Sequence, residues 1–301
     1  MRFELALRGA GGEPVSFERT LHSHGLVRLP PNRLASNVLT LPLRVEDGSL
    51  TLATLSQGRA GFADVEVTDR RRSEAFLQAV RGKLRAMLRL DEDLSSFYAR
   101  AARSADLAWV TAGAGRFLRG GSVFEDLVKT IATTNCTWSA TVRMVSALVG
   151  ELGEPVGNLR AFPTPQAMAD APEAFYRERM KAGYRGAYLR TIAADVSAGR
   201  LDLDAFPKLA DDKLEAALLA LPGVGPYAAA HMLLLLGHTQ HLILDSSTRP
   251  KYARLIGRKV PSDAAIVRHF RPYGRFAGLA FWLFVTRDWI VEPGTDEVKP
   301  R

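Results

Sequence analysis

The stretch Leu221–Asp245, LPGVGPYAAAHMLLLLGHTQHLILD, carries the strongest local pattern in the sequence. A helical pattern that begins at Asp211-Asp212 stops just before Gly223-Val224-Gly225, where two glycines can adopt positive φ in a tight turn. Pro226 suits the first position of a following helix, because its missing N–H costs nothing there. The pattern predicts two helices joined by a glycine turn, and then an apolar strand that ends at the lone carboxylate of Asp245.

The predicted pair of helices, over about residues 211–237, can bind an anion at its turn. The N–H groups of the turn and of the exposed helix N-terminus can point outward together, and the helix dipole favours negative charge there. The glycines matter because they let a phosphate approach the backbone itself. The turn is therefore a candidate phosphate-binding site.

Composition narrows the possible partners. The chain has 301 residues, of which 47% are hydrophobic, and a formal net charge of +8. This length allows a substantial core and two sub-domains around one cleft. The positive charge suits a polyanion such as nucleic acid, but many soluble proteins are mildly basic, so charge alone leaves both interpretations open.

Cysteine content and hydropathy favour a soluble protein of the cytoplasm. We also expect it to be a monomer and, if it is bacterial, to associate with the nucleoid. Cys136 is the only cysteine, which excludes an intrachain disulfide and any zinc or iron–sulfur site built from several thiolates. We expect no metal ion and no other cofactor. The N-terminal run MRFELALRGA lacks an apolar core of signal-peptide length, and the longest apolar run, AAAHMLLLLG, is too short to cross a bilayer. No membrane partner is expected.

Residues 1–105 predict a small antiparallel sheet with accompanying helices. Apolar and polar residues alternate in four segments before residue 70, and Asp47-Gly48 lies between two of them as a hairpin signal. Helical spacing of apolar residues follows over Glu74–Leu88, and a shorter helix is expected over Leu94–Ala102.

Two polar groups in this N-terminal region have two interpretations each. Arg70-Arg71-Arg72 is typical of a solvated surface, and a contact to a DNA backbone is the alternative. His22 and His24 have no Cys or acidic residue at metal-ligand spacing, so no metal site is predicted there. We interpret both as solvated loop histidines, with a place at a pocket mouth as the alternative.

We predict a helical core over residues 106–301, in which the pattern is helical from about Gly120 nearly to the end. One helix begins at a capping box, Ser122-Val-Phe-Glu125, and stops at the polar run ATTNCTWSA before apolar spacing resumes. This break offers Asn135 and Trp138 to a cleft, or else uses them as a helix cap and a core residue. Further on, AGYRGAYL places Arg185 between two glycines, either as a phosphate contact or as part of a helix–helix corner.

These motifs together resemble the helix-hairpin-helix-GPD superfamily of DNA glycosylases. The resemblance rests on LPGVG, on Pro226, on the Ala-rich second helix, and on Asp245, 18 residues after Tyr227. Three further segments are similar to the 8-oxoguanine DNA glycosylase branch: FEDLVKTIATTNCTWSATVRMVSALVG, FPTPQAMA and AGYRGAYLRTIAADV. The likeness covers about residues 70–290 and extends less firmly to the N-terminal sheet.

The resemblance implies an α+β fold in which the N-terminal sheet packs on a mostly helical core of two lobes with a cleft between them. It implies double-stranded DNA containing a damaged base as the partner, with the target nucleotide turned out into a pocket. Asp245 matches the catalytic aspartate, and Asn135 matches the residue that fills the hole left in the duplex. The expected DNA contacts are Gly223, Val224, Gly225, Tyr227, Asn135 and Arg185. The alternative for Asp245 is a capping role for a helix that starts at Ser246.

The sequence departs from the family at the position of the lyase lysine. Tyr227 stands there, and a phenol cannot form a Schiff base with the sugar. Lys251 follows Asp245 by six residues and would face elsewhere on a regular helix. We therefore predict a monofunctional glycosylase without AP-lyase activity, which hydrolyses the N-glycosidic bond and leaves an abasic site.

The base pocket departs as well. The alignment puts Phe281 where the branch has a base-reading glutamine, and Val285 where it has a stacking aromatic residue. The expected pocket residues are Tyr227, His231, Phe281, Trp282 and Trp138. Stacking with little polar discrimination favours alkylated purines. The alternatives are an 8-oxoguanine-type glycosylase for oxidised purines, a DNA-binding protein that has lost catalysis, or an aromatic helix that belongs wholly to the core.

Overall fold

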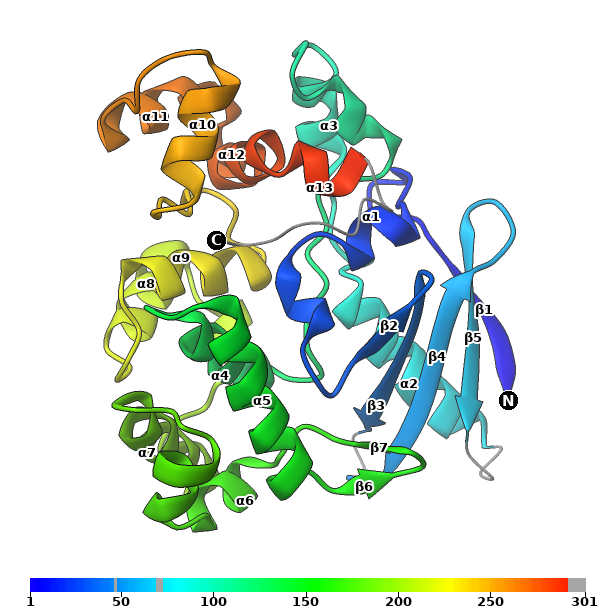
Figure 1. Cartoon of the computed structure of the whole chain (residues 1–301). Coiled ribbons are helices and arrows are strands. Elements are labelled where there is room, and N and C mark those ends of the chain that lie inside the picture. The colour runs from blue at the N-terminus through cyan, green and yellow to red at the C-terminus, as the bar shows by residue number, and fades with distance from the viewer. Residues whose placement is uncertain (46–47, 69–72, 292–301) are drawn as a thin grey trace.

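The computed structural model describes residues 1–45, 48–68 and 73–291. A β-sheet occupies one side of the molecule and helices occupy the other, so the α+β prediction is confirmed (Figure 1). Asp47 and the triplet Arg70-Arg71-Arg72 lie outside the described residues.

The sheet has five antiparallel strands in the order β1-β5-β4-β3-β2. Their bounds are β1 (Arg2–Ala6), β2 (Arg33–Ala35), β3 (Val38–Arg44), β4 (Leu50–Gln57) and β5 (Phe62–Thr68). Alternate side chains of these strands are buried against α2 (Glu74–Met87), as period-two patterning requires. The hairpin predicted between the third and fourth strands is confirmed by their antiparallel pairing.

The other helices run from the first loop to the C-terminal region, and most of them surround a second, larger core. Their bounds, with the short strands among them, are α1 (Phe17–Leu21), η1 (Gly25–Arg28), α3 (Ser95–Ala101), η2 (Ala108–Ala112), α4 (Val123–Thr133), α5 (Trp138–Leu152), β6 (Pro155–Val156), β7 (Leu159–Arg160), α6 (Pro165–Asp170), η3 (Phe175–Arg179), α7 (Arg185–Ser197), η4 (Phe206–Lys208), α8 (Asp211–Leu219), α9 (Pro226–Leu235), α10 (Thr248–Leu255), α11 (Asp263–Phe270), η5 (Arg271–Phe276), α12 (Ala277–Val285) and α13 (Arg287–Val291). The predicted helices over residues 74–88 and 94–102 correspond to α2 and α3.

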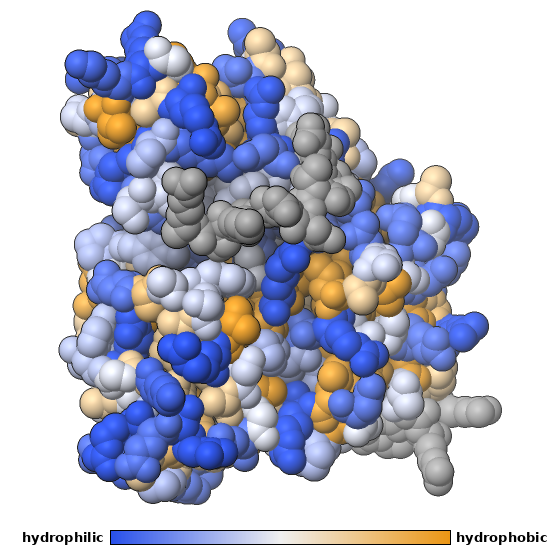
Figure 2. Space-filling view, viewed as in Figure 1, coloured by the Kyte–Doolittle hydropathy of each residue, from blue (hydrophilic) through white to orange (hydrophobic). Residues whose placement is uncertain are grey.

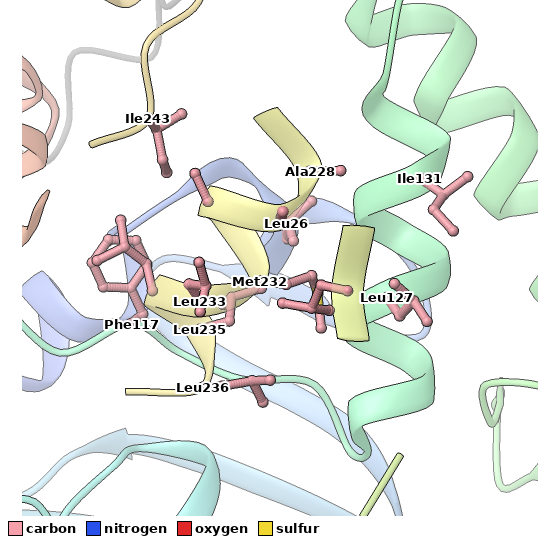
Figure 3. Close-up of a cluster of buried hydrophobic side chains, with 14 of the residues drawn as sticks. Leu26, Phe117, Leu127, Ile131, Ala228, Met232, Leu233, Leu235, Leu236 and Ile243 are labelled. Carbon is pink, nitrogen blue, oxygen red and sulfur yellow. The ribbon is translucent and has the colours of Figure 1, made fainter. Parts of the chain in front are cut away.

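Helix α9 lies at the centre of the second core. Every residue from Ala228 to Leu235 is buried, which fits a helix that is apolar all round. Leu127 and Ile131 of α4 pack on one side of it, and Phe117 and Ile243 lie on the other (Figure 3). Helix α12 is buried along its whole length as well. The stretch that dominates the sequence is thus also the centre of the packing.

The N-terminal region contributes to both cores. The sheet core takes its residues from Leu5 to Leu90, with Leu118 added, whereas Leu26, Leu29 and the α3 residues belong to the helical core. The predicted division at residue 105 and the two-lobed arrangement stay predictions.

The surface is polar over the outer helices. Hydrophilic side chains gather over α10 and α11 and over α6 and α7 (Figure 2). Among the described helices, none combines the length and apolar character needed to cross a bilayer.

Candidate active site

The glycine turn between α8 and α9 forms as predicted, but its two glycines do different things. Gly223 has φ +81°, and a Cβ added there would lie 2.8 Å from Cδ2 of Tyr188. Gly225 has φ −97°, so only the first of the two glycines uses the positive φ that both can adopt. A Cβ at Gly225 would meet nothing within 4 Å, and the residue is exposed. Gly225 therefore leaves the backbone open to an approaching group.

The turn is held by its own backbone and by the core. The Val224 N–H donates to the Leu221 carbonyl, and the Val224 side chain is buried. Pro226 opens α9, so the N–H groups of Tyr227 and Ala228 lie in the first turn, where no helical carbonyl is in reach. The helix N-terminus and the open glycine thus form one electropositive corner.

Asp245 lies at the start of α10, at the end of an extended segment that is not a strand, so the predicted strand before it is wrong. Its Oδ1 accepts the N–H groups of Ser247 (2.8 Å) and Thr248 (2.6 Å). Thr248 Oγ1 accepts from the Asp245 N–H (2.9 Å) and donates to the Ile243 carbonyl (2.8 Å).

The capping alternative for Asp245 is therefore right for one oxygen, although the helix begins at Thr248 rather than Ser246. Within the described chain, all hydrogen bonds to the Asp245 carboxylate go to Oδ1. The side chain is half-buried. The cap fixes the carboxylate in place, and Oδ2 remains for a ligand.

Tyr227 brings the glycine turn and Asp245 together. Burial raises the pKa of the Tyr227 phenol, a hydrogen bond with Thr133 opposes this rise, and the negative charge of Asp245 adds to it. Thr133 ends α4, and Cys136 from the following turn also acts on the same phenol. The Tyr227 phenol is thus a neutral hydroxyl group that extends from α9 toward the α4–α5 turn and Asp245.

Asn135 is at the tip of the α4–α5 turn. It is exposed and has φ +46°, a left-handed conformation that asparagine tolerates better than most residues. Its Nδ2 donates to the Tyr184 hydroxyl at 3.3 Å. The tip therefore presents an amide to solvent.

Arg185 is buried behind this tip rather than exposed to solvent. Its guanidinium donates to the Thr134 carbonyl and, at 3.4 Å, to Thr134 Oγ1, and it lies 4.6 Å from the centre of the Tyr184 ring. Arg185 fastens the α4–α5 turn to α7, which corresponds to the predicted helix–helix corner.

Four aromatic rings form what we call the site cluster: Tyr227, His231, Trp282 and Phe117. The His231 ring lies 6.1 Å from Tyr227 and 6.1 Å from Trp282, and Trp282 lies 5.8 Å from Phe117. The Trp282 indole N–H donates to the Ser23 carbonyl (2.9 Å). Three of the five predicted pocket residues are therefore together.

Trp138 lies at the edge of this region, half-buried against the first 3-10 helix. A Cβ added to Gly25 would lie 3.2 Å from Cη2 of Trp138, so the indole packs on the Gly25 backbone. Gly25 follows His24, whose ring is 5.8 Å from that of His231. Trp138 thus borders the site cluster from the α5 side.

Phe281 lies elsewhere. Its ring packs 5.4 Å from Phe270 and 6.2 Å from Tyr252, in what we call the back cluster, which Phe284 completes. Adjacent residues on a helix point about 100° apart, so Phe281 and Trp282 cannot face the same space. The structure therefore does not bring Phe281 to the other predicted pocket residues.

His24 was expected in a solvated loop, and for this residue the expectation is wrong. It is only 5% exposed, because its Nε2 bonds to the Leu118 carbonyl (2.7 Å) and its Nδ1 accepts from the Leu26 N–H. Burial lowers its pKa to about 3, and His231 reinforces this. The apolar residues around it in LHSHGLVRL were the available signal. His22 is half-buried and bonds to Asn37.

Comparison with known proteins gives a consistent fold. No protein-family model and no curated protein matches the sequence. The 3-methyladenine DNA-glycosylase from Archaeoglobus fulgidus superposes with a TM-score of 0.77 and 22% identity, over 95% of this chain and 98% of that one. The chain has the DNA-glycosylase fold. The predicted likeness to the helix-hairpin-helix-GPD glycosylases is thereby confirmed at the level of fold.

Two further structures share the fold. MBOgg1, solved with a low-affinity DNA ligand, matches with a TM-score of 0.70 and 16% identity over 95% of this chain and 96% of its own. The Clostridium acetobutylicum 8-oxoguanine glycosylase/lyase, bound to double-stranded DNA with cytosine opposite 8-oxoG, matches with a TM-score of 0.66 and 19% identity. That match covers 88% of this chain and 92% of the other. Among the described residues of this chain, no group of three His, Cys, Asp or Glu side chains is placed to hold a metal ion.

Proposed function

We propose that this protein is a monofunctional DNA glycosylase that excises a damaged purine from double-stranded DNA. The observation that carries the proposal is Asp245, whose carboxylate is held by the first turn of α10 through one oxygen and has the other available. It lies close enough to Tyr227 of the glycine turn to act on the phenol's pKa. A carboxylate and an anion-binding corner side by side suit cleavage of a bond next to a phosphate.

DNA would be held from two elements. The open backbone at Gly225 and the N-terminus of α9 suit a phosphate, and the net charge of +8 favours a polyanion. Asn135 projects from the opposite turn and fits the space that a flipped nucleotide leaves in the duplex. Arg185 serves this arrangement by holding the turn, and not by contacting a phosphate.

The chemistry requires charge stabilisation more than acid catalysis at Asp245. As the N-glycosidic bond breaks, the base leaves with the electron pair and positive charge develops on C1′ and the ring oxygen of the sugar. The free Oδ2 of Asp245 can stabilise that charge and orient a water for attack on C1′, as carboxylates do in glycoside hydrolysis. The water supplies a hydroxyl group to the sugar. Its remaining proton goes to the departing base where the base was neutral in DNA, and to solvent where alkylation had already made the base cationic, since such a base leaves in neutral form.

A lyase step needs an amine, and among the described residues neither Tyr227 nor Lys251 offers a free one near Asp245. Tyr227 carries a phenol that burial keeps protonated. Lys251 is engaged with Asp288 at 2.6 Å and lies 4.7 Å from the centre of the Trp289 ring. We therefore propose hydrolysis to an abasic site as the only reaction.

Two lesion classes compete. The site cluster of Tyr227, His231 and Trp282 offers ring faces to a base, which favours alkylated purines whose glycosidic bond is already weak. Oxidised purines are the second candidate, since the Clostridium acetobutylicum structure with this fold is named as an 8-oxoguanine glycosylase/lyase.

The test is excision from duplexes that each carry one defined lesion, followed by alkali to reveal abasic sites. We expect release of a methylated purine, and we expect Asp245→Asn to lower the rate of release by about 10²-fold or more. Asparagine keeps an Oδ1 that can cap α10, so the melting temperature should not fall, whereas Asp245→Ala removes cap and charge together.

Three outcomes would correct the proposal. Strand breaks without alkali, or borohydride trapping of the protein on DNA, would show a lyase. Faster release of 8-oxoguanine would favour the second lesion class. Tight DNA binding without release of any base would leave a non-catalytic DNA-binding protein.

A further inference from the structure

His231 is an unusual buried polar residue. It is 6% exposed, and neither ring nitrogen has a hydrogen-bond partner among the described residues. Buried polar side chains nearly always have at least one partner, because leaving one unpaired costs free energy. His231 lies on α9, one turn after Tyr227, within the site cluster.

The neighbouring His24, in contrast to His231, is buried with a hydrogen-bond partner at each ring nitrogen. The two rings lie 5.8 Å apart at 85°, and both are buried. His24 uses both nitrogens, and its bond to the Leu118 carbonyl makes Nε2 the protonated one. Nothing comparable selects a tautomer for His231 among the described residues.

The His231 ring lies next to residues of the proposed active site, 6.1 Å from the ring of Tyr227 and 6.1 Å from that of Trp282. Tyr227 joins it to Asp245 on one side, and Trp282 packs edge to face on the other. A planar ring that stacked against these aromatics would bring its polar edge to the imidazole. Burial lowers the pKa of His231 to about 4, so the ring is neutral at physiological pH and carries one donor and one acceptor.

We propose that His231 reads the hydrogen-bonding edge of the extruded base, and that its free choice of tautomer lets the site accept purines with either a 6-amino or a 6-oxo group. This inference rests on the proposed glycosylase function and adds the residue that recognises the base. It commits the site to alkylated adenines and alkylated guanines alike.

The chemistry follows from the two edges. A 6-amino purine presents a donor at position 6 and an acceptor at N1, whereas a 6-oxo purine presents the reverse pattern. A histidine fixed in one tautomer offers the matching group to only one of them. A neutral imidazole that can move its proton between the two nitrogens matches both at little cost.

The experiment measures binding of the free bases 3-methyladenine and 7-methylguanine by tryptophan fluorescence, for which Trp282 is a close reporter. Wild type should bind both bases with affinities within about tenfold of each other. His231→Phe keeps the ring and removes both nitrogens, and should weaken both by about tenfold or more, the effect of one lost hydrogen bond.

A matched control separates recognition from folding. His269→Phe changes an exposed histidine that bonds to Tyr252 of the back cluster, and should leave both affinities unchanged. His231→Phe removes two unpaired buried atoms, so its melting temperature should stay the same or rise while base binding falls. A purely structural histidine would show the opposite.

The outcomes distinguish this inference from the proposed function. Unchanged binding of both bases to His231→Phe, or no binding of either base to wild type, overturns the inference while lesion excision stands by itself. A loss confined to one base means that His231 has a fixed tautomer, and also overturns it. Base binding that depends on His231, without excision from any duplex, upholds base recognition and rejects the glycosylase function.

Discussion

Phe281 and Trp282 are neighbours on α12, yet they belong to two clusters with opposite properties. On the Phe281 side, the back cluster joins α10, α11 and α12, and the one hydroxyl group in it, that of Tyr252, bonds to His269. On the Trp282 side, the site cluster contains His231, whose ring nitrogens have no partner in the described chain. The polar group of the back cluster has a hydrogen-bond partner, whereas the imidazole of the site cluster has none among the described residues.

This difference teaches where to look for function in an apolar helix. Burial does not separate the two sides, because Phe281 and Trp282 are both buried. The hydrogen bonding of their buried polar neighbours does separate them. A buried imidazole without partners costs free energy, so a residue that served stability alone would have a hydrogen-bond partner or would be apolar. The following substitutions test whether one side serves stability and the other serves recognition.

The largest effect is expected at Phe281. Phe281→Ala leaves a cavity among Phe270, Tyr252 and Phe284, and should lower the free energy of unfolding by about 3–5 kcal/mol. Urea denaturation measures this loss. Excision by the fraction that remains folded should be nearly normal.

Trp282→Phe is the matched change on the other side. It removes the indole N–H that bonds to Ser23 but keeps an aromatic ring, so the stability loss should be smaller and the loss of base binding larger. The contrast between the clusters fails if Phe281→Ala abolishes excision without lowering stability.

The second-largest effect is expected in the pH dependence of the free energy of unfolding, to which His231 of the site cluster contributes. The pKa of His231 falls from 6.5 in the unfolded chain to about 4 in the fold, because burial disfavours the charged ring. Between these values the unfolded chain binds a proton that the folded chain does not, so stability is fully present above pH 6.5 and is lost as pH falls toward 4. At 1.36 kcal/mol per pKa unit, this amounts to roughly 3 kcal/mol.

The measurement compares wild type with His231→Phe by urea denaturation at pH 7 and at pH 4. Asp126 acts in the opposite direction, since burial raises its pKa to about 6 and the folded state then holds the proton below that pH. This contribution is common to both proteins and cancels in the difference. A difference in unfolding free energy that is the same at both pH values would show that His231 titrates equally in the folded and unfolded states.

The smallest effect is expected at Arg185, which acts through the α4–α5 turn. Arg185→Ala frees Thr134 and loosens Asn135, so kcat/KM for a lesion in a duplex should fall by about tenfold. The same lesion in a single strand leaves no hole to fill and should be released at the wild-type rate. Arg179→Ala, a substitution at an exposed arginine paired with Glu151, is the control. An equal fall on both substrates would mean that Arg185 has only a structural role.

Much of the fold could be predicted because its signals are local. Alternation predicts the strands β1, β3, β4 and β5, and helical spacing with Ser and Pro signals predicts α2, α4, α8 and α9. The glycine turn and Asp245 are close in sequence, so their proximity follows from a short chain. The segment before Asp245 is not a strand as predicted, because a short apolar run such as Leu242–Leu244 does not reveal whether a partner strand exists.

The rest depended on contacts between distant segments. Arg185 looks like a surface arginine in AGYRGAYL, and only the approach of Thr134, 51 positions earlier, shows that it is buried. The sequence around His24 suggests a solvated loop, and only the hydrogen bond from its Nε2 to the distant Leu118 carbonyl shows that the ring is buried. Phe281 and Trp282 are equally plausible pocket residues in a helix that is apolar all round, because such a helix has no polar face to orient it.

By itself, the sequence determined the α+β class, the glycine turn, the helix that follows it and the presence of Tyr227 in place of an amine. These features depend on backbone preferences and on residue identity, which need no distant partner. Only the tertiary structure decided which side of α12 faces His231, which arginine holds the Asn135 turn, and which oxygen of Asp245 stays free. Those outcomes depend on long-range packing and on the pairing of buried polar groups, and neither is encoded in any single stretch of chain.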